Sequence, residues 1–162
     1  MRDTVDTITR YTLVFLMGLL VVDVVWQVFT RYILASPSTF TDELARFLLI
    51  WVSLLGGAYA SGKHMHLSID LFSHRLSPRG QQKLAIIIYL IIIAFVTTVL
   101  IIGGSMLVYY VYIYGQRTSA LQIPMAYIYL IGPISGLLIL YYKVSDIKRL
   151  MNQTPAEIKE NQ

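Results

Sequence analysis

A single carboxylate stands inside a long apolar stretch of the sequence. Asp23 interrupts the run from Tyr11 to Phe29, which contains no other charged residue. Because an ionised group inside a bilayer is costly unless it is paired or neutralised, such a residue is a functional candidate by default. Two interpretations stay open: a structural contact with Arg31, a tyrosine or a partner, or the handling of a solute or proton. A transporter acting alone would need several inward polar groups, so the sequence favours the structural contact.

The three histidines lie close together, outside the apolar stretches. His64 and His66 are two residues apart, and His74 follows. Zinc sites normally use three or four ligands, and the chain has no cysteine to complete such a set. No metal site is therefore expected, and His66 and Asp70 are instead spaced for a hydrogen-bonded pair on one helical turn. Nucleophile-elbow and phosphate-loop motifs are also absent, so the sequence predicts neither an enzyme nor a bound cofactor.

Charged residues gather at the start of the second apolar stretch. A turn signal at 36–38 precedes Thr39 and Asp42, whose spacing fits a capping box. Asp42 and Glu43 then fall in the first helical turn, where the helix dipole favours negative charge. Glu43 and Arg46 are three residues apart, so the two side chains can form an ion pair on one face. A capped helix start explains this pattern, and a surface facing a partner stays open as the alternative.

The elements that carry these residues are membrane helices. Of the 162 residues, 56% are hydrophobic and 14% are charged, whereas soluble domains have about 45–50% and about 25%. This composition excludes a disordered chain, a disulfide scaffold and a nucleic-acid binder with a dense basic face. A spanning helix needs about 17–25 apolar residues. The sequence therefore predicts an all-α integral membrane protein, a single domain over 1–162, with spans at 11–29, 44–60, 84–114 and 125–142.

The third apolar segment is too long for an upright helix. It contains 33 uncharged residues between Lys83 and Arg117, which would reach about 50 Å against a hydrocarbon core of about 30 Å. We expect it to tilt or to project beyond the headgroups. Its last part is rich in tyrosines, which either settle at the membrane interface or pack between helices; they are Tyr109, Tyr110, Tyr112 and Tyr114.

The distribution of basic residues predicts the orientation. Ten of the 13 Lys and Arg residues lie in the N-terminal flank, the loop between the second and third spans, and the C-terminal tail. Only Arg31, Arg46 and Arg117 lie on the other side. The positive-inside rule therefore places both termini in the cytoplasm. The first apolar run exceeds the usual signal-peptide length and contains Asp23, so it is expected to stay as an uncleaved helix.

The loop between the second and third spans has helical periodicity. Apolar residues recur there at spacings of four, three and four, which predicts a short amphipathic interfacial helix at about 65–76. A short helix packed under the bundle is the alternative. The polar tail at 151–162 is expected to be disordered.

Several of these residues together resemble a known family. Glu43-x-x-Arg46, Trp51, Gly56 and the run His66-Leu67-Ser68-Ile69-Asp70 are similar to the small membrane subunit (DctQ-type, Q component) of tripartite ATP-independent periplasmic (TRAP) transporters. Arg31-Tyr32 before a Ser-Pro turn, and Leu121-Gln122-Ile123-Pro124 before the last span, also fit. The resemblance covers residues 28–76, with a weaker similarity over 119–136.

The resemblance implies a non-catalytic scaffolding subunit in the bacterial inner membrane. Its partners would be a large membrane subunit, a transient periplasmic substrate-binding protein and membrane lipids. No nucleic acid is expected among its partners. The large subunit would take up an organic acid, such as a C4-dicarboxylate or sialic acid, and would bind the coupling sodium, so this chain needs no cofactor. Arg31, Glu43, Arg46, Trp51, Gly56, His66 and Asp70 would then be structural or partner-interface residues.

A second class of function stays open. The chain could form a self-contained homo-oligomeric channel or exporter that uses Asp23 in a pore. That interpretation predicts transport by the purified chain alone, abolished by Asp23→Asn.

Overall fold

The computed structural model describes residues 2–36, 38–63 and 78–152, and within these ranges every regular element is helical. Four helices are long and apolar enough to cross a membrane: Arg2–Tyr32, Thr39–Lys63, Gly80–Ile113 and Met125–Met151. They confirm the predicted all-α membrane fold. The elements are α1 (Arg2–Tyr32), α2 (Thr39–Lys63), α4 (Pro78–Val96), the π-helix η1 (Thr97–Gly103), α5 (Gly104–Ile113), α6 (Met125–Tyr129) and α7 (Ile131–Asn152).

Two of the sequence-based predictions fall on the remaining residues. The interfacial helix at 65–76, which includes His66 and Asp70, lies outside the described part of the chain. Most of the predicted disordered tail lies outside it as well. Its first two residues, Met151 and Asn152, belong to α7.

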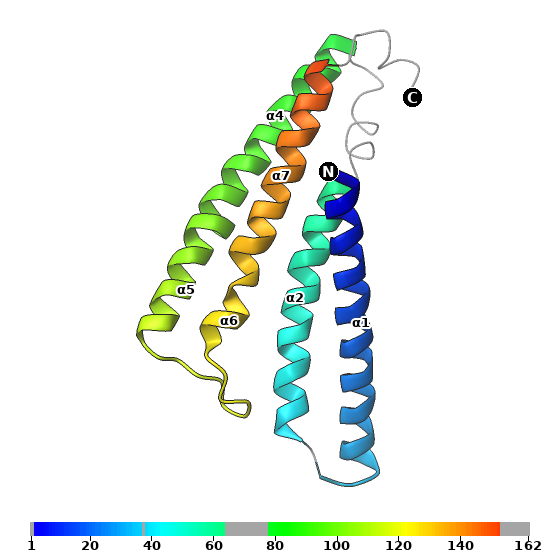
Figure 1. Ribbon diagram of the computed structural model, residues 1–162, viewed down its shortest axis with the longest axis vertical. Helices are drawn as coiled ribbons and strands as arrows, with labels where there is room; N and C mark the ends of the chain where they lie inside the picture. Colours follow the sequence, from blue (N-terminus) through cyan, green and yellow to red (C-terminus); the bar gives the residue numbers. More distant parts are fainter. Residues whose placement is uncertain (1, 37, 64–77, 153–162) are drawn as a thin grey trace.

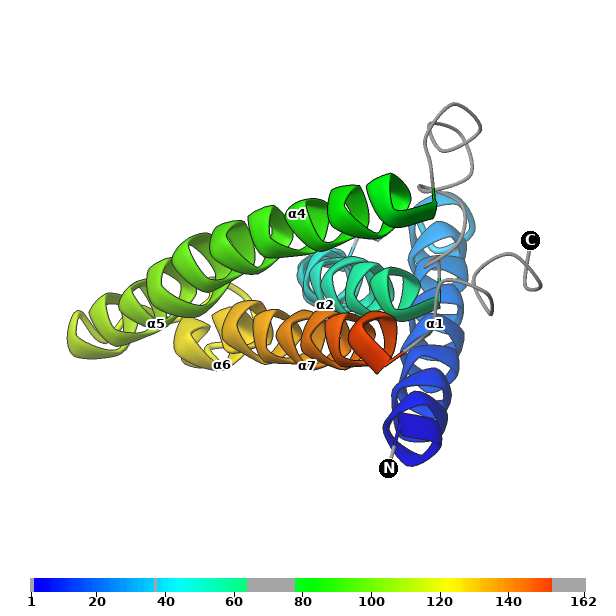
Figure 2. The ribbon, with the colours of Figure 1, turned by 90° about the horizontal axis from the view of Figure 1, so that it is seen from above.

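The helices α2 and α7 form the centre of the molecule. Figure 1 shows α1 and α2 as a hairpin, with α7 on the other side of α2 and the long α4–α5 rod beyond α7. The view from above shows α1 crossing the end of this arrangement (Figure 2). α2 packs against both α1 and α7, and α7 packs in turn against α4, η1 and α5. The bundle is therefore held together mainly through α2 and α7.

α1 packs through one narrow seam. Apart from Val5, its buried and half-buried residues recur at alternating spacings of four and three, which is the pattern of a helix in coiled-coil contact. These residues are Arg2, Asp6, Thr9, Leu13, Leu16, Leu20, Asp23, Gln27 and Thr30. Polar groups on α1 thus face α2, whereas apolar side chains cover its other faces.

The start of α2 differs in detail from the predicted capping box. The helix begins at Thr39, so the capping residue is Ser38 rather than Thr39. The backbone N–H of Thr41 donates to the Ser38 hydroxyl at 3.5 Å, and the Thr41 hydroxyl donates to the Ser38 carbonyl at 3.0 Å. Ser38 therefore satisfies one of the helix's unpaired N–H groups.

The π-helix η1 lies in the middle of the third membrane helix, between α4 and α5. Ala85, Tyr89 and Val96 lie on the packed side of α4. The packed side continues from Val96 at intervals of four through Leu100 and Gly104, and it includes Val111 of α5. The four tyrosines at 109–114 are exposed, at 54–72%, so they do not pack between the described helices of this chain.

Three close contacts at glycines bring α7 against its neighbours. A methyl group at Gly136 would lie 2.9 Å from Cγ1 of Ile101, and one at Gly104 would lie 3.0 Å from Cδ of Pro133. A methyl group at Gly62 would lie 2.9 Å from the ring of Tyr142. A larger residue at any of these positions would push the helices apart.

Candidate functional site

Glu43 anchors the loop between α5 and α6. Its carboxylate accepts three backbone N–H groups, from Ser119 at 2.9 Å, Ala120 at 2.9 Å and Leu121 at 2.7 Å. Three convergent N–H donors form an anion-binding nest in the backbone. Glu43 occupies this nest and so fixes the tip of the loop against the start of α2; we call this contact the Glu43 anchor.

The loop is itself shaped to present those donors. Gly115 and Gln122 have positive φ, at 59° and 55°, and reverse the chain on either side of the tip. The Thr118 N–H donates to the Ile123 carbonyl at 3.0 Å, while the Ile123 N–H donates to the Thr118 hydroxyl at 3.1 Å. The Met125 N–H closes the base of the loop on the Gln116 carbonyl at 3.0 Å.

The predicted ion pair between Glu43 and Arg46 is therefore wrong. Arg46 pairs with Asp42, one helical turn earlier, while Glu43 points to the loop. Asp42 also accepts a hydrogen bond from the Gln27 amide of α1 at 3.0 Å. The two acidic residues of the first turn thus bind different parts of the molecule, Asp42 the α1 helix and Glu43 the α5–α6 loop.

Trp51 links α2 to the joint between α6 and α7. Its indole N–H donates to the carbonyl of Ile128 at 3.2 Å. The helix is interrupted at Leu130, and Pro133 has no N–H to offer to the carbonyl four residues earlier. Trp51 therefore holds the residue next to Tyr129, whose carbonyl Pro133 cannot bond.

The other predicted residues differ in burial and in their contacts. Asp23 lies in the α1–α2 seam with 7% exposure, and its Oδ2 atom has no hydrogen-bond partner in the described part of the chain. Arg31, in the last turn of α1, is exposed. Gly56 faces Leu13 of α1, and a methyl group there would meet its Cδ2 atom at 3.9 Å, an ordinary contact. Close packing within this chain therefore does not require a glycine at position 56.

A polar cluster at the opposite end of α2 was not predicted from the sequence. Arg2 donates to the fully buried Asp146 at 2.7 Å and to the Gly62 carbonyl at 2.7 Å. Lys143 donates to the Ser61 carbonyl at 2.7 Å and lies 3.6 Å from Asp146. Two cations thus meet the last carbonyls of α2, where the helix dipole favours positive charge. This terminal cluster ties α1, α2 and α7 together.

Nothing in the local sequence pointed to this cluster. Arg2 and Asp146 are 144 positions apart, and charges near helix ends are ordinarily solvated. Lys143 is 5% exposed, and its ammonium lies 4.9 Å from the centre of the Tyr89 ring, a cation–π distance. Only the packing of α7 between α2 and α4 shows that these charges are buried.

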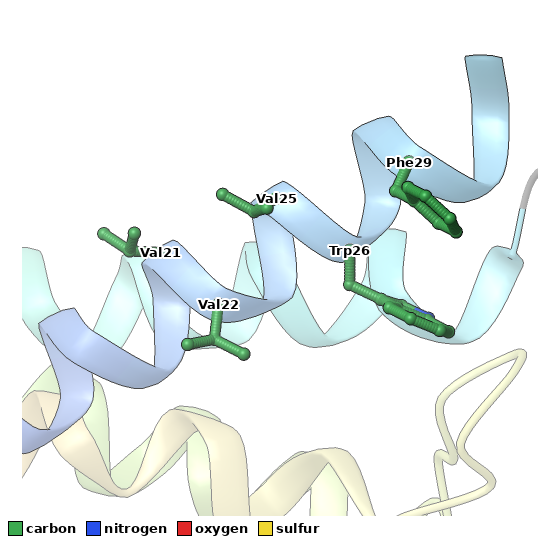
Figure 3. Close-up of a pocket in the computed structure, with 5 residues that line it drawn as sticks. All are labelled: Val21, Val22, Val25, Trp26 and Phe29. Carbon is green, nitrogen blue, oxygen red and sulfur yellow. The ribbon is translucent and has the colours of Figure 1, made fainter. Parts of the chain in front are cut away.

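An apolar groove runs along the outside of α1. Figure 3 shows the five side chains that line it: Val21, Val22, Val25, Trp26 and Phe29. All five are exposed, by 40–67%. Because such an apolar surface is unfavourable in water, it must be covered by lipid or by another protein.

Within the described residues, no group of three His, Cys, Asp or Glu side chains is placed to hold a metal ion. The described polar contacts instead hold parts of the chain together. Glu43 binds the α5–α6 loop, Trp51 binds the joint between α6 and α7, and the terminal cluster binds the end of α2.

Comparison with known proteins places the chain in a family. The model of the family "Tripartite ATP-independent periplasmic transporters, DctQ component" matches residues 19–153, which is most of the chain. This chain belongs to the DctQ family. It is a multi-pass membrane protein of the TRAP small-permease type.

Two relatives of the DctQ chain carry the small-permease name. A sialic acid TRAP transporter small permease protein from Vibrio cholerae is 33% identical over 86 residues, or 53% of this chain and 50% of the relative. A putative TRAP transporter small permease protein from Haemophilus influenzae is 32% identical over 72 residues, or 44% of this chain and 45% of the relative. The match thus spans about half the length of each relative.

A third relative is a longer protein. An isethionate TRAP transporter permease protein, DctMQ, from Oleidesulfovibrio alaskensis is 29% identical over 101 residues, which are 62% of this chain and 16% of the relative. The DctQ match includes Asp23, the Glu43 anchor and Asp146, but begins after Arg2.

Proposed function

We propose that this DctQ chain is the scaffolding small subunit of a TRAP transporter in a bacterial inner membrane. It supports a large membrane subunit that takes up an organic acid together with sodium, after a periplasmic protein has delivered the acid. The carboxylate class, such as a C4-dicarboxylate or a sialic acid, follows from the family resemblance. The substrate and sodium sites would lie on the large subunit.

The observation that carries the scaffold role is the placement of polar contacts. The Glu43 anchor and the Asp42–Arg46 pair lie near the start of α2, and the terminal cluster lies near its end. Between them, Asp23 is the one ionisable side chain buried within the described α1–α2 seam. A pathway for a polar solute needs several inward polar groups at the middle of the membrane. A rigid frame needs its polar bonds at the helix ends.

The third relative supports the proposal that this chain has a large membrane subunit as its partner. In the DctMQ permease the region similar to this chain makes up 16% of a longer polypeptide. We infer that the present chain contacts an equivalent large membrane subunit supplied separately. The apolar groove on α1 offers exposed surface to lipid or to such a subunit.

The orientation belongs to the same proposal. The basic flanks support an orientation with both termini in the cytoplasm. The turn between α1 and α2 and the α5–α6 loop would then face the periplasm, so the Glu43 anchor would hold a loop on the side where the binding protein docks.

Transport by reconstituted vesicles tests the proposal. We would compare vesicles that contain the chain alone with vesicles that contain the chain and its copurified membrane partner. A panel of carboxylates would be supplied with the binding protein under a sodium gradient. We expect uptake only with the partner present, dependent on sodium, and largely retained after Asp23→Asn. Sodium-independent transport by the chain alone, lost after Asp23→Asn, would instead establish the self-contained channel or exporter.

A further inference from the structure

The buried carboxylate of Asp23 has no charge partner among the residues that the structure describes. Asp23 is 7% exposed, and within residues 2–36, 38–63 and 78–152 its Oδ2 atom accepts no hydrogen bond. An unpaired carboxylate in a low-dielectric seam is strongly unfavourable. A cation within reach would remove most of the free-energy cost of burying this carboxylate. The residues of α2 that face Asp23 therefore decide whether its charge is paired.

The register of the α1–α2 hairpin identifies those residues. Lys63 bonds Asp6 at 2.7 Å, and Asp42 bonds Gln27 at 3.0 Å. Between these two contacts, Leu13 faces Gly56. In all three pairs the two residue numbers add up to 69, as expected for antiparallel helices in one constant register. The residue opposite Asp23 is therefore Arg46.

Both side chains also lie on the correct faces. Asp23 is one helical turn before Gln27 on α1, and Arg46 is one turn after Asp42 on α2. Residues four apart share a helix face. Since Gln27 and Asp42 meet across the seam, the backbone positions of Asp23 and Arg46 lie opposite each other one turn further along, while the Arg46 side chain turns outward to Asp42.

We propose that Arg46 is the charge partner of Asp23, and that its guanidinium turns from Asp42 to Oδ2 of Asp23 when the hairpin lies in a bilayer. Asp42 keeps the Gln27 amide when Arg46 leaves. The ion pair joins α1 to α2 one turn deeper than the Gln27–Asp42 bond. It depends on the hairpin alone and not on the identity of the transported solute.

The surroundings of Arg46 favour this exchange. Its side chain is 73% exposed while it pairs with Asp42, itself 42% exposed. Arg46 is seven residues into α2, about 10 Å along the helix. Arg46 is two residues inside the predicted span at 44–60, and where α2 enters the bilayer an outward guanidinium would meet lipid, in which a charge is costly. Turning inward removes that exposed charge and neutralises Asp23 at the same time.

Cysteine cross-linking tests the register. The chain has no cysteine, so Asp23→Cys with Arg46→Cys introduces the only pair. In native membranes we expect rapid disulfide formation for this pair. The control pair, Val22→Cys with Arg46→Cys, should react much more slowly because Val22 is 67% exposed on another face. Equal rates for the two pairs would overturn the proposed register.

A double-mutant cycle on the full chain, purified with the subunits that stay bound, tests the ion pair. Arg46→Gln leaves a buried, unpaired carboxylate and should lower Tm by at least about 4 °C. Adding Asp23→Asn to Arg46→Gln should restore much of that loss, because no buried charge remains.

The control cycle combines Asp42→Asn with Arg46→Gln, whose effects should add. The proposal is overturned if Asp42→Asn, rather than Asp23→Asn, relieves the loss caused by Arg46→Gln. It is overturned equally if the Asp23→Asn and Arg46→Gln effects simply add. A second test exchanges the two charges. The variant with Asp23→Arg and Arg46→Asp should be more stable than the Arg46→Gln variant.

Discussion

Asp42 and Glu43 are neighbours in the sequence but bind different partners in space. Asp42 faces the seam with α1, whereas Glu43 accepts three N–H groups from a loop more than 70 residues later in the chain. The family pattern in the sequence singled out Glu43 and Arg46 as candidate structural or partner-interface residues. It could not show the partner of Glu43, because backbone N–H groups leave no signature in residue types.

The Glu43 anchor predicts local protection from hydrogen exchange. Glu43→Ala removes the acceptor for the N–H groups of Ser119, Ala120 and Leu121. Because bonds to a charged acceptor are stronger than neutral ones, we expect these three amides to exchange at least about tenfold faster. Hydrogen–deuterium exchange of the α5–α6 loop measures this.

Asp42→Asn is the matched control for the Glu43 substitution. It changes the neighbouring carboxylate without touching the loop, so exchange at 119–121 should stay as in the natural chain. Unchanged exchange after Glu43→Ala would show that other contacts order the loop.

At the scale of elements, the four membrane helices were predictable and their packing was not. Long uncharged stretches define the helices, because a charge in the middle of a span is costly. The π-helix at 97–103 escaped prediction because it lies within a long uncharged segment, where no residue type marks a change of helix type. The terminal cluster escaped because Arg2 and Asp146 meet only after α7 has packed against α2.

The contact between α2 and α7 makes a prediction about Gly62. In Gly62→Ala the new methyl group would lie 2.9 Å from the ring of Tyr142. Tyr142 is fully buried and has no room to retreat. We expect a loss of about 1–3 kcal/mol in the free energy of unfolding, measured as a lowered Tm in detergent or nanodiscs.

Gly57→Ala is the control, since a methyl group at that position would meet nothing within 4 Å. In a helix this substitution is expected to be neutral or slightly stabilising. If both variants melt at the same temperature, the α2–α7 contact does not depend on the glycine.

At the scale of the whole molecule, the chain is a frame with much of its apolar surface uncovered. α1 touches the rest of the described structure mainly through α2, and its outer faces are apolar. The long α4–α5 rod likewise exposes side chains such as Phe95, Met106 and Tyr112. In a membrane this surface is compatible with lipid, and it also leaves broad faces for a larger subunit.

We propose that this DctQ chain works as part of a larger permease. The most direct test is a pull-down of the C-terminally tagged chain from native membranes in mild detergent, with mass spectrometry of the proteins recovered in stoichiometric amounts. We expect to recover one large multi-pass membrane protein at a one-to-one ratio. Recovery of this chain alone, as a homogeneous oligomer, would contradict it.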